Sequence, residues 1–548
     1  MESSDRKLSV KILSQHFKSS HPSLVQDLQH VDEACRKIAT FWDEYDYGSL
    51  EANGFRSFVK KCDMLFHNMK TLVERQNDPK LLQGYMCMVP AFVRQVSVLE
   101  IVRQKDADGH HDKTRFYFPE DNTMLHLLLT ATNEEVRPMY TRPGAFWLHP
   151  IAAYFNTSLC YVILLTNASW SEKMKLVLNP SYFAHQVVKM IKDLNVQRIR
   201  DMFKVASLFP FNAIVAASRY VIGTTSRYAD LPRKSKWQFH LGDTSSLLRI
   251  ERTKRDSLSD KSKSVKCLIL SSVAGDCQTL IFHVHGSGYI SMTPSDHEAY
   301  LRYWSKKLTA TVVAPDYAKA PENPFPSGLQ DILDAYIQLT SSDVTGIIGF
   351  QPKKIVLTGD SAGGNMAMAL LFALNEIKRR LGGDVIMPIG VCLQSPLTNA
   401  MSIPASGAQT CLDLFLPSTL TTTVATAYAR TDPETESDWF QKEEGSTVQV
   451  IGETLARWAT LIRDPYFNLM AYRDWEELDM PLQIQVGQFD GLLDNAIDMA
   501  KKWTGAVTLD VMEGMPHCFH SMPTARKEAE LIVLRLKQMI YLNPDRQA

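Results

Sequence analysis

Three residue types that together support nucleophilic catalysis occur in order along the second half of this 548-residue chain. Ser361 lies between Gly359 and Gly363 in a Gly-x-Ser-x-Gly pattern, Asp490 begins the run DGLLD, and His517 lies in GMPHCF. A serine hydroxyl becomes nucleophilic when a histidine takes its proton and a carboxylate orients that histidine. The order Ser, Asp, His therefore predicts acyl transfer through a covalent serine intermediate.

Each of these residues follows a run of apolar and β-branched residues that predicts a buried strand, at residues 355–357, 482–486 and 507–512. After Ser361, residues 365–374 are strong helix formers. A sharp strand-to-helix turn exposes its serine above the sheet, with a helix N-terminus beneath it. The five-residue pattern alone also fits a tight turn without catalysis. Asp490 and His517, each at a strand end, favour the catalytic interpretation.

A glycine-rich turn, HGSG at residues 285–288, directly follows another predicted strand at residues 279–284. Glycines let backbone N–H groups turn toward a neighbouring oxygen. We therefore expect the N–H groups of Ser287, Gly288 and Ala362 to form an oxyanion hole. The alternative is a glycine turn with no catalytic role. The residues predicted to support the two turns are His285, Gly286, Gly359 and Gly363.

The second half of the chain alternates between strand and helix patterns. Further strands are predicted at residues 310–314 and 390–393, and helices at residues 297–308 and 328–339. This alternation predicts an α/β fold with a mostly parallel sheet, helices on both faces and ligands at the carboxyl ends of the strands.

Several of these stretches resemble the hormone-sensitive lipase family of the α/β-hydrolases. FHVHGSGY at residues 282–289 resembles the family's His-Gly-Gly-Gly block, and PDYAKAPENPFP at residues 315–326 resembles its Asp-Tyr…Ala-Pro-Glu signature. GDSAGGN at residues 359–365 matches its nucleophile elbow, and DPY at 464–466, DGLLD at 490–494 and PH at 516–517 resemble later landmarks. The resemblance covers residues from about 265 to 520.

The resemblance implies a neutral serine lipase of lipid catabolism that needs no cofactor and no metal. Its implied substrates are acylglycerols (diacylglycerol above all, with triacylglycerol and monoacylglycerol) and cholesteryl and retinyl esters. It also implies a cytosolic protein that is peripheral on lipid droplets and membranes, forms homodimers and is controlled by a kinase. Fatty-acid-binding proteins and lipid-droplet coat proteins are the implied protein partners.

The sequence departs from the family pattern at Ser287, Gly491 and Cys518, where the family usually has Gly, Pro and Gly. Ser287 keeps its N–H group, but activity would fall if this position needs the backbone freedom of glycine. Two alternatives therefore stay open. One is a carboxylesterase or deacetylase acting on small soluble esters, and the other is a lipid-droplet scaffold protein with weak catalysis.

Three further carboxylates lie near the motifs. Asp494 is the nearest rival to Asp490 as the catalytic acid, and we expect it to cap the following helix or support the loop. Asp360 is expected to brace the turn beside the nucleophile. Glu322 is expected to be a structural anchor.

Residues 1–250 carry little recognisable chemistry and predict a mainly helical domain for regulation, dimerisation or lipid docking, ahead of a catalytic domain at residues 265–545. One helical face repeats from Leu24 to Trp42, with Ser23 as its expected N-cap, and a second repeats from Tyr182 to Ile199. The boundary is predicted in the basic, Ser-rich residues 250–264, where Ser257 fits a kinase site as well as a plain linker.

Composition excludes several classes of protein. The net charge of −1 gives no argument for nucleic-acid binding. Nine scattered cysteines form no CxxC pair, which argues against a zinc or redox motif and fits a reducing compartment. The pair at His110 and His111 fits a solvated turn better than a metal loop. The N-terminus lacks the apolar core of a signal peptide, and no apolar run approaches the roughly 20 residues of a membrane helix.

Overall fold

The structure is a computed structural model. It describes residues 3–76, 79–86, 88–106, 164, 168–179, 182, 186, 196–206, 223–233, 235–241, 247–252, 264–272, 278–341, 344–399, 404–407, 409, 416, 418–429, 460–521 and 526–541. The predicted Ser257 site and the His110–His111 turn lie outside these residues.

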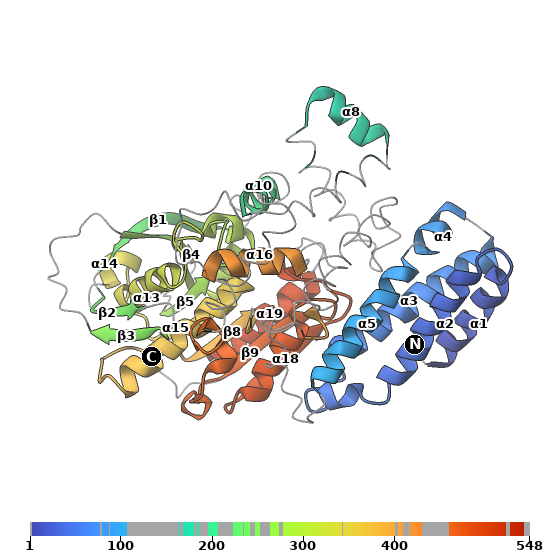
Figure 1. Ribbon diagram of the computed structural model, residues 1–548. Helices are drawn as coiled ribbons and strands as arrows, with labels where there is room; N and C mark the ends of the chain where they lie inside the picture. The colour runs from blue at the N-terminus through green and yellow to red at the C-terminus, as the bar shows by residue number, and fades with distance from the viewer. Residues whose placement is uncertain are drawn as a thin grey trace.

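The second half of the described chain is built on an eight-stranded sheet (Figure 1). In spatial order its strands are β1 (Thr224–Pro232), β4 (Ser264–Ser272), β6 (Thr311–Pro315), β5 (Thr279–Val284), β7 (Lys354–Asp360), β8 (Gly390–Gln394), β9 (Leu482–Gly487) and β10 (Val507–Met512). β6, β5, β7, β8, β9 and β10 run parallel, whereas β4 is antiparallel to both β1 and β6. The predicted mostly parallel sheet is confirmed.

Helices cover both faces of this sheet, so each face has its own apolar core. Helices α12 (Glu298–Leu308) and α19 (Arg526–Tyr541) contribute to one core, and α13 (Ser327–Leu339), α15 (Ala362–Arg379) and α18 (Leu493–Lys502) to the other. Strand β5 shows the alternation directly, because Ile281 faces the first core while Leu280 and Phe282 face the second. The described part of this half also contains helices α14 (Thr345–Ile348) and α16 (Ser418–Ala429).

The N-terminal part of the described chain is helical, as predicted. Its helices are α1 (Ser3–Phe17), α2 (Pro22–Ile38), α3 (Gly54–Arg75), α4 (Pro79–Met86) and α5 (Val89–Lys105), followed after a gap by α8 (Trp170–Leu178) and α10 (Val196–Ala206). The predicted face of α2 is buried from Leu24 to Ile38. Its N-cap is His21 rather than Ser23, because Pro22 already occupies the first helical turn.

The mainly helical region up to about residue 250 ends in strands that were not predicted, which lie within residues 224–252. β1 pairs along its whole length with β4, and β2 (Trp237–His240) pairs with β3 (Arg249–Arg252). Most side chains of β1 are exposed, so this edge strand lacks the alternating apolar pattern that reveals a strand in a sequence. The eight-stranded sheet therefore begins before the predicted start of the catalytic domain at residue 265.

Candidate active site

Ser361 stands at a sharp turn between strand β7 and helix α15. Its backbone has φ 53° and ψ −123°, a conformation that a non-glycine residue adopts only under strain. The turn requires glycine on both sides. A Cβ atom on Gly359 would lie 2.5 Å from the carbonyl oxygen of Gly363, and one on Gly363 would lie 2.1 Å from that of Val284. The Ser361 N–H donates to the Gln394 carbonyl at 2.9 Å, which ties the turn to the neighbouring strand β8.

The structure brings the three residues of the predicted triad into one hydrogen-bonded row. His517 Nε2 lies 3.0 Å from Ser361 Oγ, and His517 Nδ1 lies 3.0 Å from each oxygen of Asp490. Asp490 follows β9 and His517 follows β10, so adjacent parallel strands deliver both residues to one edge of the sheet. All three residues are buried, and Ser361 is the most exposed of them at 8%.

Asp490 controls the protonation of His517. Burial alone would lower the pKa of the imidazole, but the charge and hydrogen bond of Asp490, together with those of Cys518, outweigh burial and hold that pKa well above its ordinary value. A histidine held this way is a strong base toward Ser361 and is stabilised in its charged form. Cys518, directly after it, has φ 58° and so occupies a conformation that glycine adopts more easily.

The predicted oxyanion turn follows β5 and packs against the nucleophile turn. Ser287 has φ 94° and Gly288 has φ 63°, so the position where serine departs from the family pattern does use backbone freedom typical of glycine. The Ser287 hydroxyl donates to the Ser291 carbonyl, which holds the turn in this conformation. In the described parts of the chain, no acceptor takes the N–H groups of Ser287, Gly288 or Ala362. These groups remain available to a developing negative charge.

His285 and Gly286, predicted to support this turn, both have close contacts there. The His285 ring stacks on Tyr317 with centroids 4.4 Å apart, and its Nδ1 lies 2.9 Å from the Gly286 carbonyl oxygen. Burial lowers the pKa of His285 well below its usual range, so this imidazole is neutral. A Cβ atom on Gly286 would lie 2.4 Å from Asp360 Oδ2, so only glycine fits there.

Asp360 braces the oxyanion turn, as expected from its place beside the nucleophile. Its Oδ1 accepts the Gly286 N–H at 3.1 Å and the Tyr300 hydroxyl at 3.2 Å. Burial alone would raise the pKa of Asp360, but the imidazoles of His297 and His283 outweigh burial and keep that pKa well below its usual range. The charged carboxylate thus links the nucleophile turn to the loop of the proposed oxyanion donors.

The buried histidines around Asp360 were not predicted from the sequence. Ring nitrogens of His283 and His297 lie with a carboxylate oxygen of Asp360 within 4.8 Å of one another, a spacing that could hold a metal ion. The Tyr300 hydroxyl, however, lies 3.0 Å from His283 Nε2 and 2.9 Å from His297 Nδ1, and it also contacts Asp360. Hydrogen bonds through Tyr300 therefore account for the cluster. The repeat of histidine two residues apart in HVH at 283–285 was its signal in the sequence.

Two other carboxylates have structural contacts, as expected. Asp494 accepts backbone N–H groups from Gly54 at 3.0 Å and Ser406 at 2.7 Å, and it faces these groups rather than His517. Glu322 pairs with Arg200 of helix α10 at 2.5 Å. Of the two carboxylates, it is therefore Asp490 that lies against His517 in the structure.

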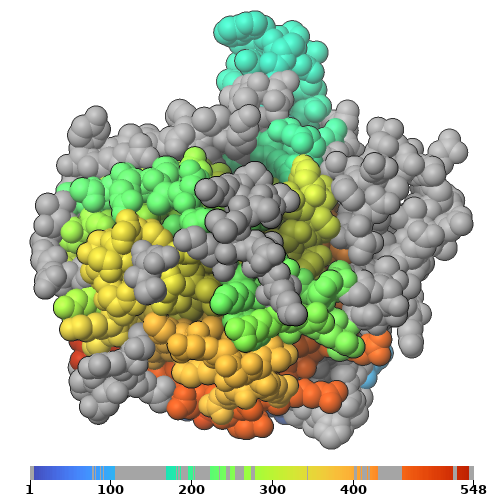
Figure 2. Space-filling view, turned by 90° about the vertical axis from the view of Figure 1, so that its left-hand side faces the viewer, coloured from blue at the N-terminus to red at the C-terminus, as the bar shows by residue number. Residues whose placement is uncertain are grey.

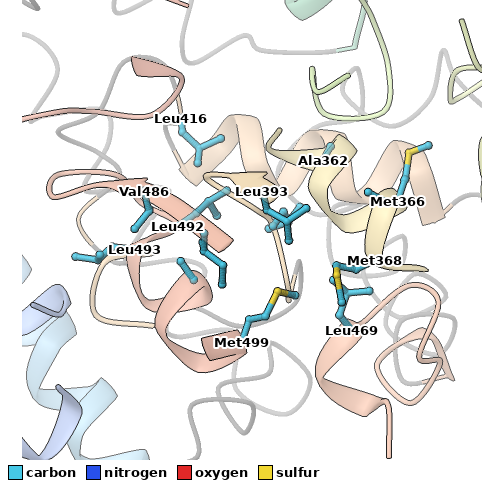
Figure 3. Packing of buried hydrophobic residues seen from close by; sticks show 14 of the residues in the cluster. Ala362, Met366, Met368, Leu393, Leu416, Leu469, Val486, Leu492, Leu493 and Met499 are labelled. Carbon is cyan, nitrogen blue, oxygen red and sulfur yellow. The ribbon is translucent and has the colours of Figure 1, made fainter. Parts of the chain in front are cut away.

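One apolar core lies beneath the elements that carry Ser361 and Asp490 (Figure 3). Ala362 and Met366 of helix α15 belong to it, as do Val486 of strand β9 and Leu492 of the loop after Asp490. Because protein interiors are close-packed, this shared core fixes the nucleophile turn relative to the acid loop.

Comparison with known proteins agrees with this geometry. Residues 281–521 match the family model described as the alpha/beta hydrolase fold. This part of the chain has the α/β-hydrolase fold. The match includes both turns and all three residues of the predicted triad, but not β1 or the N-terminal helices. In the described parts of the chain, no helix is both long and apolar enough to cross a membrane.

Curated relatives of the α/β-hydrolase domain include hormone-sensitive lipases. The Bos taurus protein is 30% identical over 207 residues, which are 38% of this chain and 26% of the relative. The Homo sapiens protein is 33% identical over 190 residues, which are 34% and 16% of the two chains. The matches therefore span about a quarter or less of these relatives. A hyperthermophilic esterase from Pyrobaculum calidifontis has a similar structure, with a TM-score of 0.47 and 18% identity over 64% of this chain and 97% of its own.

Proposed function

We propose that this protein is a serine carboxylic ester hydrolase with Ser361 as nucleophile, His517 as general base and acid, and Asp490 as the orienting acid. The single observation that carries the proposal is the hydrogen-bonded row from Ser361 Oγ through His517 to Asp490. A serine, a base within hydrogen-bond reach and a third group that orients the base are the parts that covalent acyl transfer requires.

In the proposed reaction, Ser361 Oγ attacks the ester carbonyl carbon while its proton passes to His517 Nε2. The tetrahedral intermediate collapses to an acyl-enzyme, and His517 gives the proton to the leaving alcohol. Water then attacks the acyl carbon and gives a proton to His517. Collapse of the second intermediate releases the carboxylic acid and returns the proton to Ser361.

The oxyanion of both intermediates would be held by the N–H groups of Ser287, Gly288 and Ala362. These donors are backbone groups fixed by two braced turns, so they need no reorganisation as charge develops. Loss of one such donor typically lowers kcat by roughly 10²- to 10³-fold.

We further propose that the substrates are lipid esters: acylglycerols, above all diacylglycerol, and cholesteryl and retinyl esters. The names of the curated relatives and the family motifs support this choice. Helix α8 supports it independently, because Trp170, Val177 and Leu178 are 82%, 59% and 71% exposed on one short helix. Figures 1 and 2 show α8 standing out from the rest of the described chain.

Helix α8 fits the surface of a lipid phase. Its apolar side chains would enter the lipid, while Lys173 and Lys175 would meet anionic headgroups. We propose a cytosolic location, peripheral on lipid droplets and membranes. Homodimers, fatty-acid-binding and droplet coat proteins as partners, and a kinase acting near Ser257 are further proposals, and these rest on the family resemblance alone.

The test compares hydrolysis of emulsified diolein with that of p-nitrophenyl butyrate, for the wild-type protein and Ser361→Ala. We expect the wild type to hydrolyse both substrates and the variant to hydrolyse neither. Activity on the butyrate alone would replace the lipase proposal with an esterase of small soluble esters. A folded wild-type protein that hydrolyses neither and does not react with a fluorophosphonate probe would be a scaffold, with the strained Ser287 as the first suspect.

A further inference from the structure

The first turn of helix α3 packs against the loop that carries Asp490, although the two are far apart in the sequence. Ser57 Oγ donates to the Gln488 carbonyl at 2.7 Å, two residues before Asp490. The N–H of Gly54, the first residue of α3, donates to Asp494 Oδ1 at 3.0 Å, four residues after Asp490. The N-terminal helices therefore hold the acid loop on both sides of its functional residue.

Asp494 is the centre of this contact. Its second oxygen accepts the N–H of Ser406 at 2.7 Å, and the Ser406 hydroxyl donates to the carbonyl of Gly491 at 2.9 Å. The carboxylate is completely buried and lies in the first turn of α18 and against the first residue of α3. Helix N-termini favour a negative charge. The Asp494 carboxylate thus connects helix α18, helix α3 and the segment that contains Ser406.

The approach of the two segments is too close for any side chain at the first residue of α3. A Cβ atom on Gly54 would lie 2.1 Å from the Ser406 nitrogen and 2.5 Å from Asp494 Oδ2. The Gly54 carbonyl also accepts a hydrogen bond from Gln409 at 2.6 Å. Because these groups are buried and hydrogen-bonded, α3 and the acid loop form one packed unit.

The carboxylate of Asp490 depends on its loop for its position. In the described parts of the chain, its donors are the N–H of Leu492 at 2.8 Å, within the loop itself, and His517. Apart from His517, no side chain of the described residues donates a hydrogen bond to it. A loop that shifts therefore carries Asp490 away from His517.

We propose that Ser57 and Asp494 are positioning residues for Asp490, and that the N-terminal helices thereby support the active site. The proposal rests on the triad proposed above. A displacement of about 1 Å at a catalytic group can lower the rate roughly 10²-fold. Both side chains are buried against the acid loop rather than exposed to a substrate, so we expect their loss to lower kcat and to leave KM for a small ester unchanged.

The experiment uses the full chain with Ser57→Ala and Asp494→Asn. The matched control is Lys60→Ala, because Lys60 lies one turn further along α3 and pairs with Glu513 in an exposed contact at 2.8 Å. We measure kcat and KM for p-nitrophenyl butyrate, the pH profile of kcat/KM, and hydrogen–deuterium exchange of residues 487–494.

For Ser57→Ala we expect kcat about tenfold lower, faster exchange of residues 487–494 and an acid limb of the pH profile at lower pH. The limb moves because a misplaced Asp490 no longer raises the pKa of His517. Asp494→Asn should show larger changes of the same kind, and Lys60→Ala should match the wild type.

Folded Ser57→Ala protein with wild-type kcat, pH profile and exchange would overturn the proposal. If Asp494→Asn does not fold, Ser57→Ala decides alone. If the wild type hydrolyses no ester, faster exchange in Ser57→Ala would still support the contact, and only the proposed function would have failed.

Discussion

Ser287 has a strained backbone and is also one of the proposed oxyanion donors. Its φ of 94° lies in the region that favours glycine, and the strain of such a conformation is of order 1–3 kcal/mol. Two contacts oppose the strain: the hydroxyl bonds to the Ser291 carbonyl, and the next residue, Gly288, packs directly under Val424 of α16. The serine hydroxyl therefore has a structural role in the oxyanion turn.

Substitutions at Ser287 separate strain from hydrogen bonding. Ser287→Ala keeps the strain and loses the hydroxyl bond, so we expect its free energy of unfolding to fall by about 1–2 kcal/mol. Ser287→Gly loses the same bond but relieves the strain, so we expect a stability close to wild type and a kcat at least as high. Urea unfolding and ester hydrolysis measure both. Equal stability losses in the two variants would contradict this account.

Among the strands, those rich in apolar and β-branched residues were predictable, and the polar edge strand β1 was not. β5 and β10 begin and end at the predicted residues, because five of the six side chains of each strand are apolar or β-branched. β1 was not predicted as a strand because most of its side chains face solvent. The triad was predictable from motifs in chain order. The positive φ of Ser287, the histidines around Asp360 and the bond from Asp494 to α3 arise from tertiary packing, which local sequence patterns do not encode.

Helix α8 gives a prediction about lipid surfaces. Trp170→Ser combined with Val177→Ser removes two exposed apolar side chains, and we expect binding to phosphatidylserine-containing vesicles and hydrolysis of emulsified diolein to fall at least tenfold. Hydrolysis of p-nitrophenyl butyrate should stay unchanged, because these side chains are exposed. Leu381→Ser, at another exposed apolar site, is the control and should behave as wild type. Undiminished vesicle binding in the double variant would exclude α8 as the docking helix.

Among the described buried histidines, His517 responds to acid in the opposite way to His285, His297 and His520. The pKa of His517 is raised by Asp490, so activity that needs the neutral imidazole disappears as pH falls through that raised value. Burial lowers the pKa values of His285, His297 and His520, so these rings gain a proton less readily in the fold than in the unfolded chain. Acid should therefore stop catalysis before it unfolds the protein.

The pKa shift of His520 gives the size of the stability that is lost when acid unfolds the protein. Burial lowers its pKa from 6.5 to about 4, and at about 1.4 kcal/mol per unit this corresponds to about 3 kcal/mol of stability. That stability is fully present above pH 6.5 and is lost as pH falls toward 4, because the unfolded chain binds the proton first. His517 acts in the opposite sense, since its raised pKa adds stability below pH 6.5. We expect His520→Gln to show a shallower loss of unfolding free energy between pH 6.5 and 4 than the wild type, measured by urea titration at each pH. Parallel curves for the two proteins would show that His520 is not the group that titrates.

A reversible loss of ester hydrolysis at a pH where both proteins remain folded would distinguish protonation of His517 from protonation of the buried neutral histidines.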